Sequence, residues 1–317
     1  MQSPMYVGVD VAKAEVVVAC SQNSFAVRGI PNTPSALKQF LQTLPSDARI
    51  GMEATGSYHF ALADLAFSMG FAVYVLNPQD TWHYAKGVGS RAKTDRVDAK
   101  LIARYTANES AHLHPYDPAT AEQRAIDQLL RRRSHIVSLK TAMRLSCADA
   151  PFLNDQAGKL MADFKDLLKQ IDQEVSRVNA LIPNRSEQVK QLQTITGIGP
   201  LTSSWLANLF DRVKFKNGDA VVAFVGMDPR PCDSGQKRGR RRLSKRGPAE
   251  GRRLLYNAAM AAAKSPVWQP MYARYRQLGW PTTAALLIIA RKILRIAFAL
   301  SKKQGAVFDP KILGIGA

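Results

Sequence analysis

Four carboxylates in the first third of the chain have the residue type and spacing that a metal-ion site requires. Asp10 ends an apolar, strand-like run, and Glu53 lies inside a second one, where a charged side chain is unfavourable unless it is paired or coordinated. Asp95 and Asp98 stand three residues apart at the start of a predicted helix, so they share one face. Hard divalent cations such as Mg²⁺ prefer carboxylate oxygens. The four together could hold two such ions and catalyse displacement at a phosphodiester.

Taken singly, these carboxylates have ordinary structural explanations. Asp95 follows Thr94 and suits the N-terminus of a helix, where a negative charge is favourable. Asp98 can pair with Lys93 or Arg96, and an aspartate at the end of a strand is often a turn former. The metal-site hypothesis therefore depends on the four being brought together by one fold.

The secondary-structure elements that would position the four carboxylates are expected to form an N-terminal domain over residues 1–112. Three antiparallel strands are followed by a helix, a strand, a second helix, a further strand and, after a loop, a third helix. This order is expected of a ribonuclease-H-like fold, and the pattern by itself supports the broader class of a mixed α/β domain. The expected strands cover 6–10, 14–20, 25–30, 49–55 and 72–76, and the expected helices 34–44, 58–69 and 95–105.

Residues 118–188 are expected to form two long antiparallel helices that break near Pro151. Apolar residues recur there at steps of three and four, and glycine and proline are scarce. An apolar seam on such helices favours a coiled-coil segment that pairs with another copy of the chain. An ordinary intramolecular helical hairpin is the alternative.

Residues 190–317 are expected to form a mainly α-helical, basic domain. It opens with LQTITGIGPLTSSWLANL, in which Gly197 and Gly199 lie between two apolar helical stretches. This is typical of a helix-hairpin-helix, whose hairpin amides can accept a nucleic-acid phosphate. The alternative is a simple tight turn.

A basic run in the same segment is a candidate nucleic-acid contact. Seven of the ten residues from Lys237 to Arg246 are basic. A solvated charge run is the commonest explanation, but the glycines and flanking helices here favour a loop laid along phosphates. The candidate contacts are Lys237, Arg238, Arg240, Arg241, Arg242, Lys245 and Arg246.

The distribution of charge supports this division of the chain. Residues 1–120 carry 10 basic and 10 acidic side chains, 121–200 carry 12 and 9, and 201–317 carry 22 and 6. The surplus of +19 in 317 residues therefore lies almost wholly in the last third. The N-terminal domain is neutral and has scattered carboxylates, whereas the C-terminal domain is cationic. This division indicates catalysis in the N-terminal domain and nucleic-acid binding in the C-terminal domain.

Composition also excludes several classes of protein. The three cysteines are far apart and form no CxxC pair, so neither a disulfide framework nor a thiolate zinc site is expected. No run of 18 apolar residues and no secretory signal occurs, so we expect no membrane partner. A cytoplasmic protein of the bacterial nucleoid is the expectation.

Five stretches of the chain together resemble a known family. VGVDVAKAEVVVA, MEATGSY, KTDRVDAKLIA, TITGIGPLTSSWLA and FVGMDPRPCDSGQKRGRRRLSKRGPAEGRRLLYNAAM resemble, in that order, the DEDD transposases of the insertion-sequence "one-ten" family. The resemblance covers nearly the whole chain. It implies a RuvC-like domain, a coiled coil and a C-terminal transposase domain.

The resemblance also implies roles for individual residues. The family's four carboxylates fall on Asp10, Glu53, Asp95 and Asp98, which would bind Mg²⁺ or Mn²⁺, and its nucleophilic serine falls on Ser234 in CDSGQ. Such enzymes form a phosphoserine link to DNA and use a structured, element-encoded guide RNA to choose donor and target DNA. The RNA requirement rests on the resemblance alone.

Ser234 needs activation from elsewhere, because a serine hydroxyl is a poor nucleophile by itself. None of the five histidines lies in the third segment, so a Ser-His-Asp triad is not expected there. The metal site is the more economical activator, and two half-sites must then meet, within one chain or between protomers. We expect a homo-oligomer, a dimer that becomes a tetramer in synapsis.

Two other functions are compatible with these residues. The first is a RuvC-like, metal-dependent nuclease that resolves junctions by hydrolysis and never joins strands. The second is a non-catalytic, basic nucleic-acid-binding protein with a degenerate ribonuclease-H-like domain. For Ser234, without the resemblance, a hydroxyl that caps a turn would be the preferred interpretation.

Overall fold

The computed structural model describes residues 4–22, 24–90, 94–231, 233–235, 239 and 241–314. The chain divides into two compact units, Met1–Pro118 and Ala119–Ala317. The two long central helices therefore belong to the same unit as the C-terminal helices. The division into three functional domains stays a prediction.

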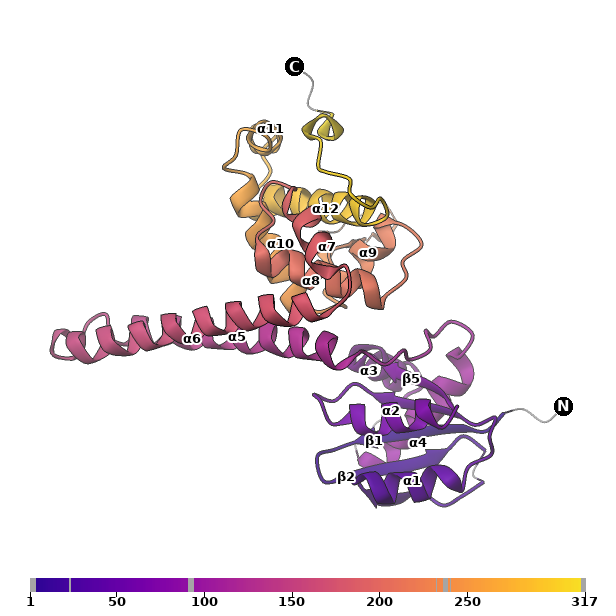
Figure 1. The fold of residues 1–317 in the computed structure, drawn as a ribbon. Helices are drawn as coiled ribbons and strands as arrows, with labels where there is room; N and C mark the ends of the chain where they lie inside the picture. Colours follow the sequence, from indigo (N-terminus) through magenta and orange to yellow (C-terminus); the bar gives the residue numbers. More distant parts are fainter. Residues whose placement is uncertain are drawn as a thin grey trace. The chain divides into compact units, whose positions relative to one another are not determined.

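The first unit is built on a five-stranded mixed sheet in the order β3-β2-β1-β4-β5 (Figure 1). β1 pairs in parallel with β4, and β4 with β5, whereas β2 is antiparallel to both β1 and β3. This arrangement is consistent with the expected ribonuclease-H-like fold. The strands are β1 (Tyr6–Val11), β2 (Glu15–Cys20), β3 (Arg28–Pro31), β4 (Arg49–Glu53) and β5 (Ala72–Leu76), and the helices α1 (Pro34–Gln42), α2 (His59–Ser68), α3 (Pro78–Gly87) and α4 (Asp95–Glu109).

Side chains alternate between two separate cores on the two faces of this sheet. Val7, Val9 and Val11 of β1 pack in one core with residues of α1 and α2. Tyr74 and Leu76 of β5 face the other way and pack with residues of α4. One face of the sheet is therefore covered by α1 and α2, and the other by α4.

Two glycines let α4 lie directly on the sheet. Gly8 of β1 and Gly51 of β4 are paired in register. A Cβ on Gly8 would lie 2.2 Å from the backbone of Ala99 and Ala103, and one on Gly51 would lie 1.9 Å from Oγ1 of Thr106. Any side chain at either position would push the helix away from the strands.

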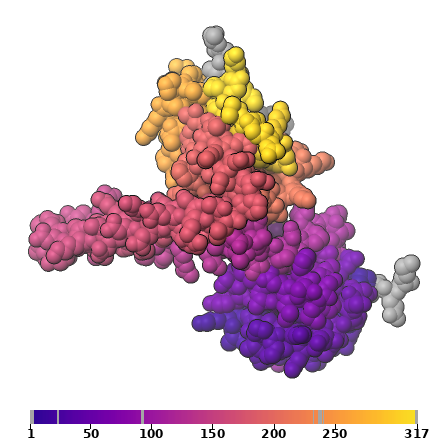
Figure 2. Space-filling model, viewed as in Figure 1, coloured from indigo at the N-terminus to yellow at the C-terminus, as the bar shows by residue number. Residues whose placement is uncertain are grey.

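The second unit is mainly helical. Leu130, Val175 and Leu206 belong to one continuous core that joins the inner ends of α5 and α6 to the helices that follow. Figure 2 shows the outer part of the α5–α6 hairpin extending beyond the packed helices of this unit. The elements are α5 (Ala121–Ser146), η1 (Pro151–Leu153), α6 (Asn154–Leu181), α7 (Arg185–Gln193), α8 (Pro200–Arg212), α9 (Gly218–Val225), β6 (Pro229–Arg230), β7 (Arg242–Leu243), α10 (Ala249–Ala262), α11 (Gln269–Gln277), α12 (Thr282–Ser301) and η2 (Pro310–Leu313).

Most of the expected helices and strands are present, with one clear difference between β5 and α4. The stretch between residues 76 and 94, expected to be a loop, contains the helix α3. Its start has the usual signals, because Asn77 accepts a hydrogen bond from the backbone of Gln79 and Pro78 occupies the first turn. The break at Pro151 is confirmed, and a 3₁₀ turn lies there.

The coiled-coil and helix-hairpin-helix interpretations stay predictions, although the helices that they require are present. Within the described part of the chain, no helix combines the length and the apolar character that crossing a bilayer demands.

Candidate active site

The structure places all four carboxylates at one end of the sheet in the first unit. Asp10 and Glu53 are two residues beyond the paired glycines Gly8 and Gly51 on neighbouring parallel strands. Because side chains alternate along a strand, both carboxylates project to the face that α4 covers. Asp95 and Asp98 lie in the first turn of α4.

Helix α4 is held so that its N-terminal turn reaches this end of the sheet. Ala99, one turn after Asp95 and next to Asp98, is one of the two residues whose backbone lies against Gly8. The helix begins at Thr94, whose hydroxyl accepts a hydrogen bond from the backbone of Val97 at 3.3 Å. The close approach at the glycine therefore fixes where the two helix carboxylates stand.

The four carboxylates influence one another electrostatically. The pKa of Asp10 is raised from 3.8 to about 6, chiefly by burial and in addition by the negative charges of Asp95, Asp98 and Glu53. Among the described residues, no lysine or arginine contributes to this shift. A half-buried carboxylate that is influenced by the negative charges of three others is compatible with a site for a divalent cation.

Glu53 has a positioning partner that the sequence analysis missed. Thr81 of α3 is buried, and its Oγ1 donates a hydrogen bond to Oε2 of Glu53 at 3.2 Å. The same hydroxyl lies 3.0 Å from the carbonyl oxygen of Pro78. Since the stretch was expected to be a loop, only the Asn77-Pro78 pair could have indicated a helix that carries Thr81.

The donor set suits Mg²⁺ or Mn²⁺, because all four ligand candidates are hard oxygen donors. In the described residues, no three histidine, cysteine, aspartate or glutamate side chains are already gathered as a ready-made metal site. Carboxylates without a cation between them repel one another. We therefore expect the four side chains to move together only when the metal ion binds.

We expect Asp10→Asn to stabilise the metal-free protein at neutral pH. Because the folded-state pKa of Asp10 is raised from 3.8 to about 6, its ionisation costs stability progressively as the pH rises from about 4 to 6, and the full cost is present above 6. Allowing for solvent screening, the variant should gain about 1–2 kcal/mol at pH 7.5 and unfold a few degrees higher in the presence of a chelator.

The difference between the two proteins should shrink as the pH falls from about 6 toward 4, because wild-type Asp10 then becomes protonated and neutral. Calorimetry of both proteins across this range measures the effect. A variant that is less stable than the wild type at pH 7.5, with no pH dependence, would contradict the electrostatic account.

Ser234 lies in the second unit, in a loop that joins β6 to β7. Arg230 pairs with Arg242 across this two-stranded sheet, and Ser234 itself is exposed. An exposed hydroxyl on a loop held by a short hairpin is accessible to a large substrate.

Asp233, directly before Ser234, ties the loop together. Its carboxylate accepts hydrogen bonds from the backbone of Gly239 at 3.1 Å and from Arg241 at 2.8 Å. The bond from Arg241 is the largest cause that lowers the pKa of Asp233, so the carboxylate stays ionised. The sequence analysis overlooked this residue, although it is the acidic neighbour of the candidate nucleophile in a basic stretch.

The base of the loop is closed by two glycines against the end of α9. Gly226 has a φ of 71°, and a Cβ there would lie 2.6 Å from the backbone nitrogen of Arg246. A Cβ on Gly247 would lie 1.8 Å from the carbonyl oxygen of Phe224. The two chain segments that lead into and out of the loop are therefore in direct backbone contact.

Only part of the predicted basic contact surface can be located. Lys237, Arg238 and Arg240 lie outside the described residues. Arg241, Arg242, Lys245 and Arg246 are all exposed. Arg241 forms an ion pair with Asp233, and the phosphate contacts of these residues stay a prediction.

The glycines of the predicted hairpin differ from one another. Gly197 has a φ of 100°, and a Cβ there would lie 2.5 Å from the carbonyl oxygen of Ala258 in α10. Close packing thus accounts for Gly197. Gly199 has open space around it and precedes α8, which has no side-chain cap.

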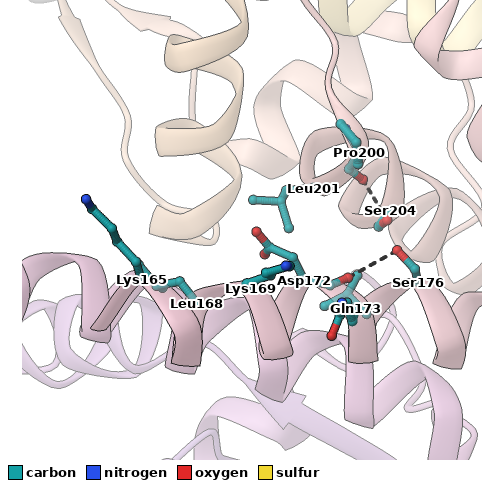
Figure 3. A pocket seen from close by; sticks show the side chains of 10 residues that line it. Lys165, Leu168, Lys169, Asp172, Gln173, Ser176, Pro200, Leu201 and Ser204 are labelled. Atoms are coloured by element: carbon teal, nitrogen blue, oxygen red, sulfur yellow. Dashed lines mark hydrogen bonds between the residues drawn. The ribbon is translucent and has the colours of Figure 1, made fainter. Parts of the chain in front are cut away.

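A cavity of about 720 Å³ lies between the N-terminal turn of α8 and the adjoining stretch of α6 (Figure 3). Lys165 and Lys169 line it from α6, and Ser204 lines it from α8 and donates to the carbonyl oxygen of Pro200. The carboxylate of Asp172, which accepts a hydrogen bond from Arg133, also lines the cavity, so its lining carries both signs of charge.

Comparison with known proteins shows the class to which this chain belongs, an enzyme of DNA recombination and transposition. The chain belongs to the IS110 family of transposases. Residues 7–148 match the model of the family's DEDD transposase domain, and residues 189–275 match that of the IS116/IS110/IS902 transposase family.

Relatives of known name cover most of the chain. A pilin gene-inverting protein of Moraxella bovis is 27% identical over 98% of this chain and 99% of its own length. The transposase for insertion sequence element IS1328 of Yersinia enterocolitica is 25% identical over 98% of this chain and 100% of its own length. A probable family 20 transposase of Pseudomonas aeruginosa is 25% identical over 84% of this chain.

Proposed function

We propose that this protein is a site-specific recombinase that cuts and rejoins DNA through a carboxylate-bound metal site and the Ser234 nucleophile. The observation that carries the proposal is the placement of Asp10, Glu53, Asp95 and Asp98 around one end of the sheet, on the face that α4 covers. The inversion and transposition named for its relatives support a reaction that joins strands as well as cutting them.

In the proposed reaction, the Oγ atom of Ser234 attacks a DNA phosphorus atom and the bond to the leaving oxygen breaks. A phosphoserine link forms, the hydroxyl proton goes to a base, and the leaving strand takes up a proton. The energy of the broken ester is kept in the link, so a strand hydroxyl can later attack it and restore Ser234.

Each part of the chain then has a separate task. Asp10, Glu53, Asp95 and Asp98 would hold Mg²⁺ or Mn²⁺, which supplies Lewis-acid stabilisation of the attacking and leaving oxygens. Thr81 orients Glu53, and Asp233 with Arg241 keeps the Ser234 loop in shape. The exposed basic residues after Ser234 bind phosphates on either side of the reacting one.

A structured RNA encoded by the same element is the proposed guide that selects donor and target DNA. The cationic surplus of the last third suits RNA as well as DNA. Copurification of the protein expressed beside its flanking DNA tests this part. A discrete RNA complementary to both sites would support it, and its absence from an active protein would refute it.

The proposal is tested by incubating the protein with donor and target duplexes and Mg²⁺, followed by a denaturing gel. Recombinant strands and DNA covalently bound to protein are expected. Hydrolysed ends without joining would favour the junction-resolving nuclease. Binding without any Mg²⁺-dependent cleavage would favour the non-catalytic protein.

The basic loop should contribute affinity without sequence preference. Replacing Arg240, Arg241 and Arg242 with glutamine should weaken binding to unrelated duplexes alike and lower the salt slope by roughly 0.9 per lost phosphate contact. Arg131, Arg132 and Arg144 of α5 provide a control with the same change of charge. Titrations at several salt concentrations measure the slope. A changed choice of site at unchanged affinity would show that the loop reads bases.

The working unit is proposed to be at least a dimer, in which Ser234 of one protomer completes the carboxylate site of another. Recombination of two duplexes cuts four strands, and one chain has a single Ser234. Leu145, Phe152 and Leu167 of the α5–α6 hairpin are exposed apolar residues that a second copy could cover.

Mixing Ser234→Ala protein with Asp10→Ala protein tests this sharing. Cleavage should return in the mixture to a substantial fraction of the wild-type level, although each variant alone is inactive. Differently tagged chains show whether mixed oligomers have formed. Mixed oligomers that stay inactive would place the whole active site within one chain.

A further inference from the structure

A second cationic cavity lies in the C-terminal unit, away from the Ser234 loop in the sequence. It has a volume of about 550 Å³ and lies between α11, α12 and η2. Its lining combines three cations, one tyrosine and an apolar floor, with no acidic side chain. The lining residues are Tyr275, Ile288, Arg291, Lys292, Arg295, Ile296, Ala299 and Ile312.

Two of the three cations are already engaged. Nε of Arg295 donates to Oδ1 of Asp219 at 2.7 Å, and Nζ of Lys292 donates to the carbonyl oxygen of Leu313 at 2.9 Å. The guanidinium of Arg291 makes no hydrogen bond or ion pair with any residue in the described part of the chain. The N–H donors of the Arg291 guanidinium are therefore able to bind a ligand in the cavity.

The surroundings of Arg291 make an anion favourable there. The side chain is partly buried, and this burial together with the positive charge of Arg295 lowers its pKa below the ordinary value. Tyr275 is the remaining ionisable neighbour that influences Arg291. A partly desolvated guanidinium beside a second cation is stabilised by a phosphate, which can accept two parallel hydrogen bonds from it.

The rest of the lining indicates more than a phosphate. Ile288, Ile296 and Ala299 offer apolar contact that inorganic phosphate cannot use, and the Tyr275 ring offers a surface for stacking. A base in a duplex is already paired and stacked, so it cannot enter such a cavity without being extruded. The combination suits a single unpaired nucleotide.

We infer that this cavity binds one unpaired nucleotide of the nucleic-acid partner, with the phosphate on Arg291 and the base against Tyr275 and the apolar floor. The inference rests on the proposed nucleic-acid function and adds a second, non-catalytic contact to it. The bound strand would be anchored at this point by recognition of a single-stranded segment.

The test uses the full-length protein and a ten-nucleotide, single-stranded DNA that carries 5-iodouracil. Irradiation should crosslink the oligonucleotide to Tyr275, as mapped by mass spectrometry. Arg291→Gln should weaken binding of this oligonucleotide about tenfold, as expected for loss of a charge-assisted hydrogen bond. Arg274→Gln, which removes the same charge from an exposed position on α11 outside the cavity, should weaken it less than about twofold.

Filling the cavity provides a second measurement that does not depend on charge. Ala299→Phe should lower both the crosslink and the affinity for the single strand, while binding of a blunt duplex changes little. Equal losses for Arg291→Gln and Arg274→Gln, or a crosslink that maps elsewhere, would overturn the inference. If either of these results were found while strand cleavage stayed intact, the nucleotide-binding role of the cavity would be refuted and the proposed recombinase function would not.

Discussion

Asp10→Ala protein is expected to cleave DNA at least about a thousandfold more slowly than the wild type, since metal-ion stabilisation of a phosphodiester transition state is worth several kcal/mol. The negative charges of the three other carboxylates all raise the pKa of Asp10, so Asp10 lies within electrostatic reach of each of them. DNA binding should change little, because the basic residues lie mainly in the other unit.

Glu53→Ala, Asp95→Ala and Asp98→Ala should each abolish cleavage as well, if the four act as one site. Asp47→Ala is the matched control, because Asp47 is exposed and precedes β4 rather than following it. Cleavage of a labelled duplex over a range of Mg²⁺ concentrations measures the effect. Wild-type recombination by the Asp10 or Glu53 variant would refute the metal-site hypothesis.

Ser234→Ala should reduce strand cleavage by roughly 10⁴-fold or more, the size of effect seen when a catalytic nucleophile is removed. The change removes one exposed hydroxyl, and the ion pair between Asp233 and Arg241 that supports the loop is left intact. Folding and DNA affinity should therefore stay close to those of the wild type.

Ser35→Ala, which removes the same atom from an exposed serine of α1, provides the control and should stay fully active. Chelator should stop the wild-type enzyme as completely as the Ser234→Ala change does. If the Ser234 variant still nicked DNA in Mg²⁺, water would be the nucleophile and the enzyme would act as a hydrolase.

The four carboxylates could be singled out from the sequence because the patterns that mark them involve residues close together in the chain. Asp10 and Glu53 stand out as charges in apolar strands, and their even spacing from Gly8 and Gly51 places each pair on one face. The start of α4 at Thr94 and the two aspartates in its first turn are also readable from the chain.

The supporting residues could not be predicted, because their roles depend on contacts between distant parts of the chain. Thr81 matters only because α3 packs where its hydroxyl reaches Glu53, 28 positions earlier. Asp233 matters because the loop returns Arg241 to it. Gly197, which the sequence assigned to phosphate binding, has a packing reason that becomes visible only when α10 is in place.

The covalent link itself tests the central claim most directly. Wild-type protein would be trapped on DNA with Mg²⁺ and a nicked substrate that cannot be rejoined, then digested and analysed by mass spectrometry. The account predicts a nucleotide attached to Oγ of Ser234, absent with chelator and absent in the Asp10→Asn protein. A nucleotide attached to Cys232 or to any other side chain, or complete cleavage with no attached protein, would contradict it.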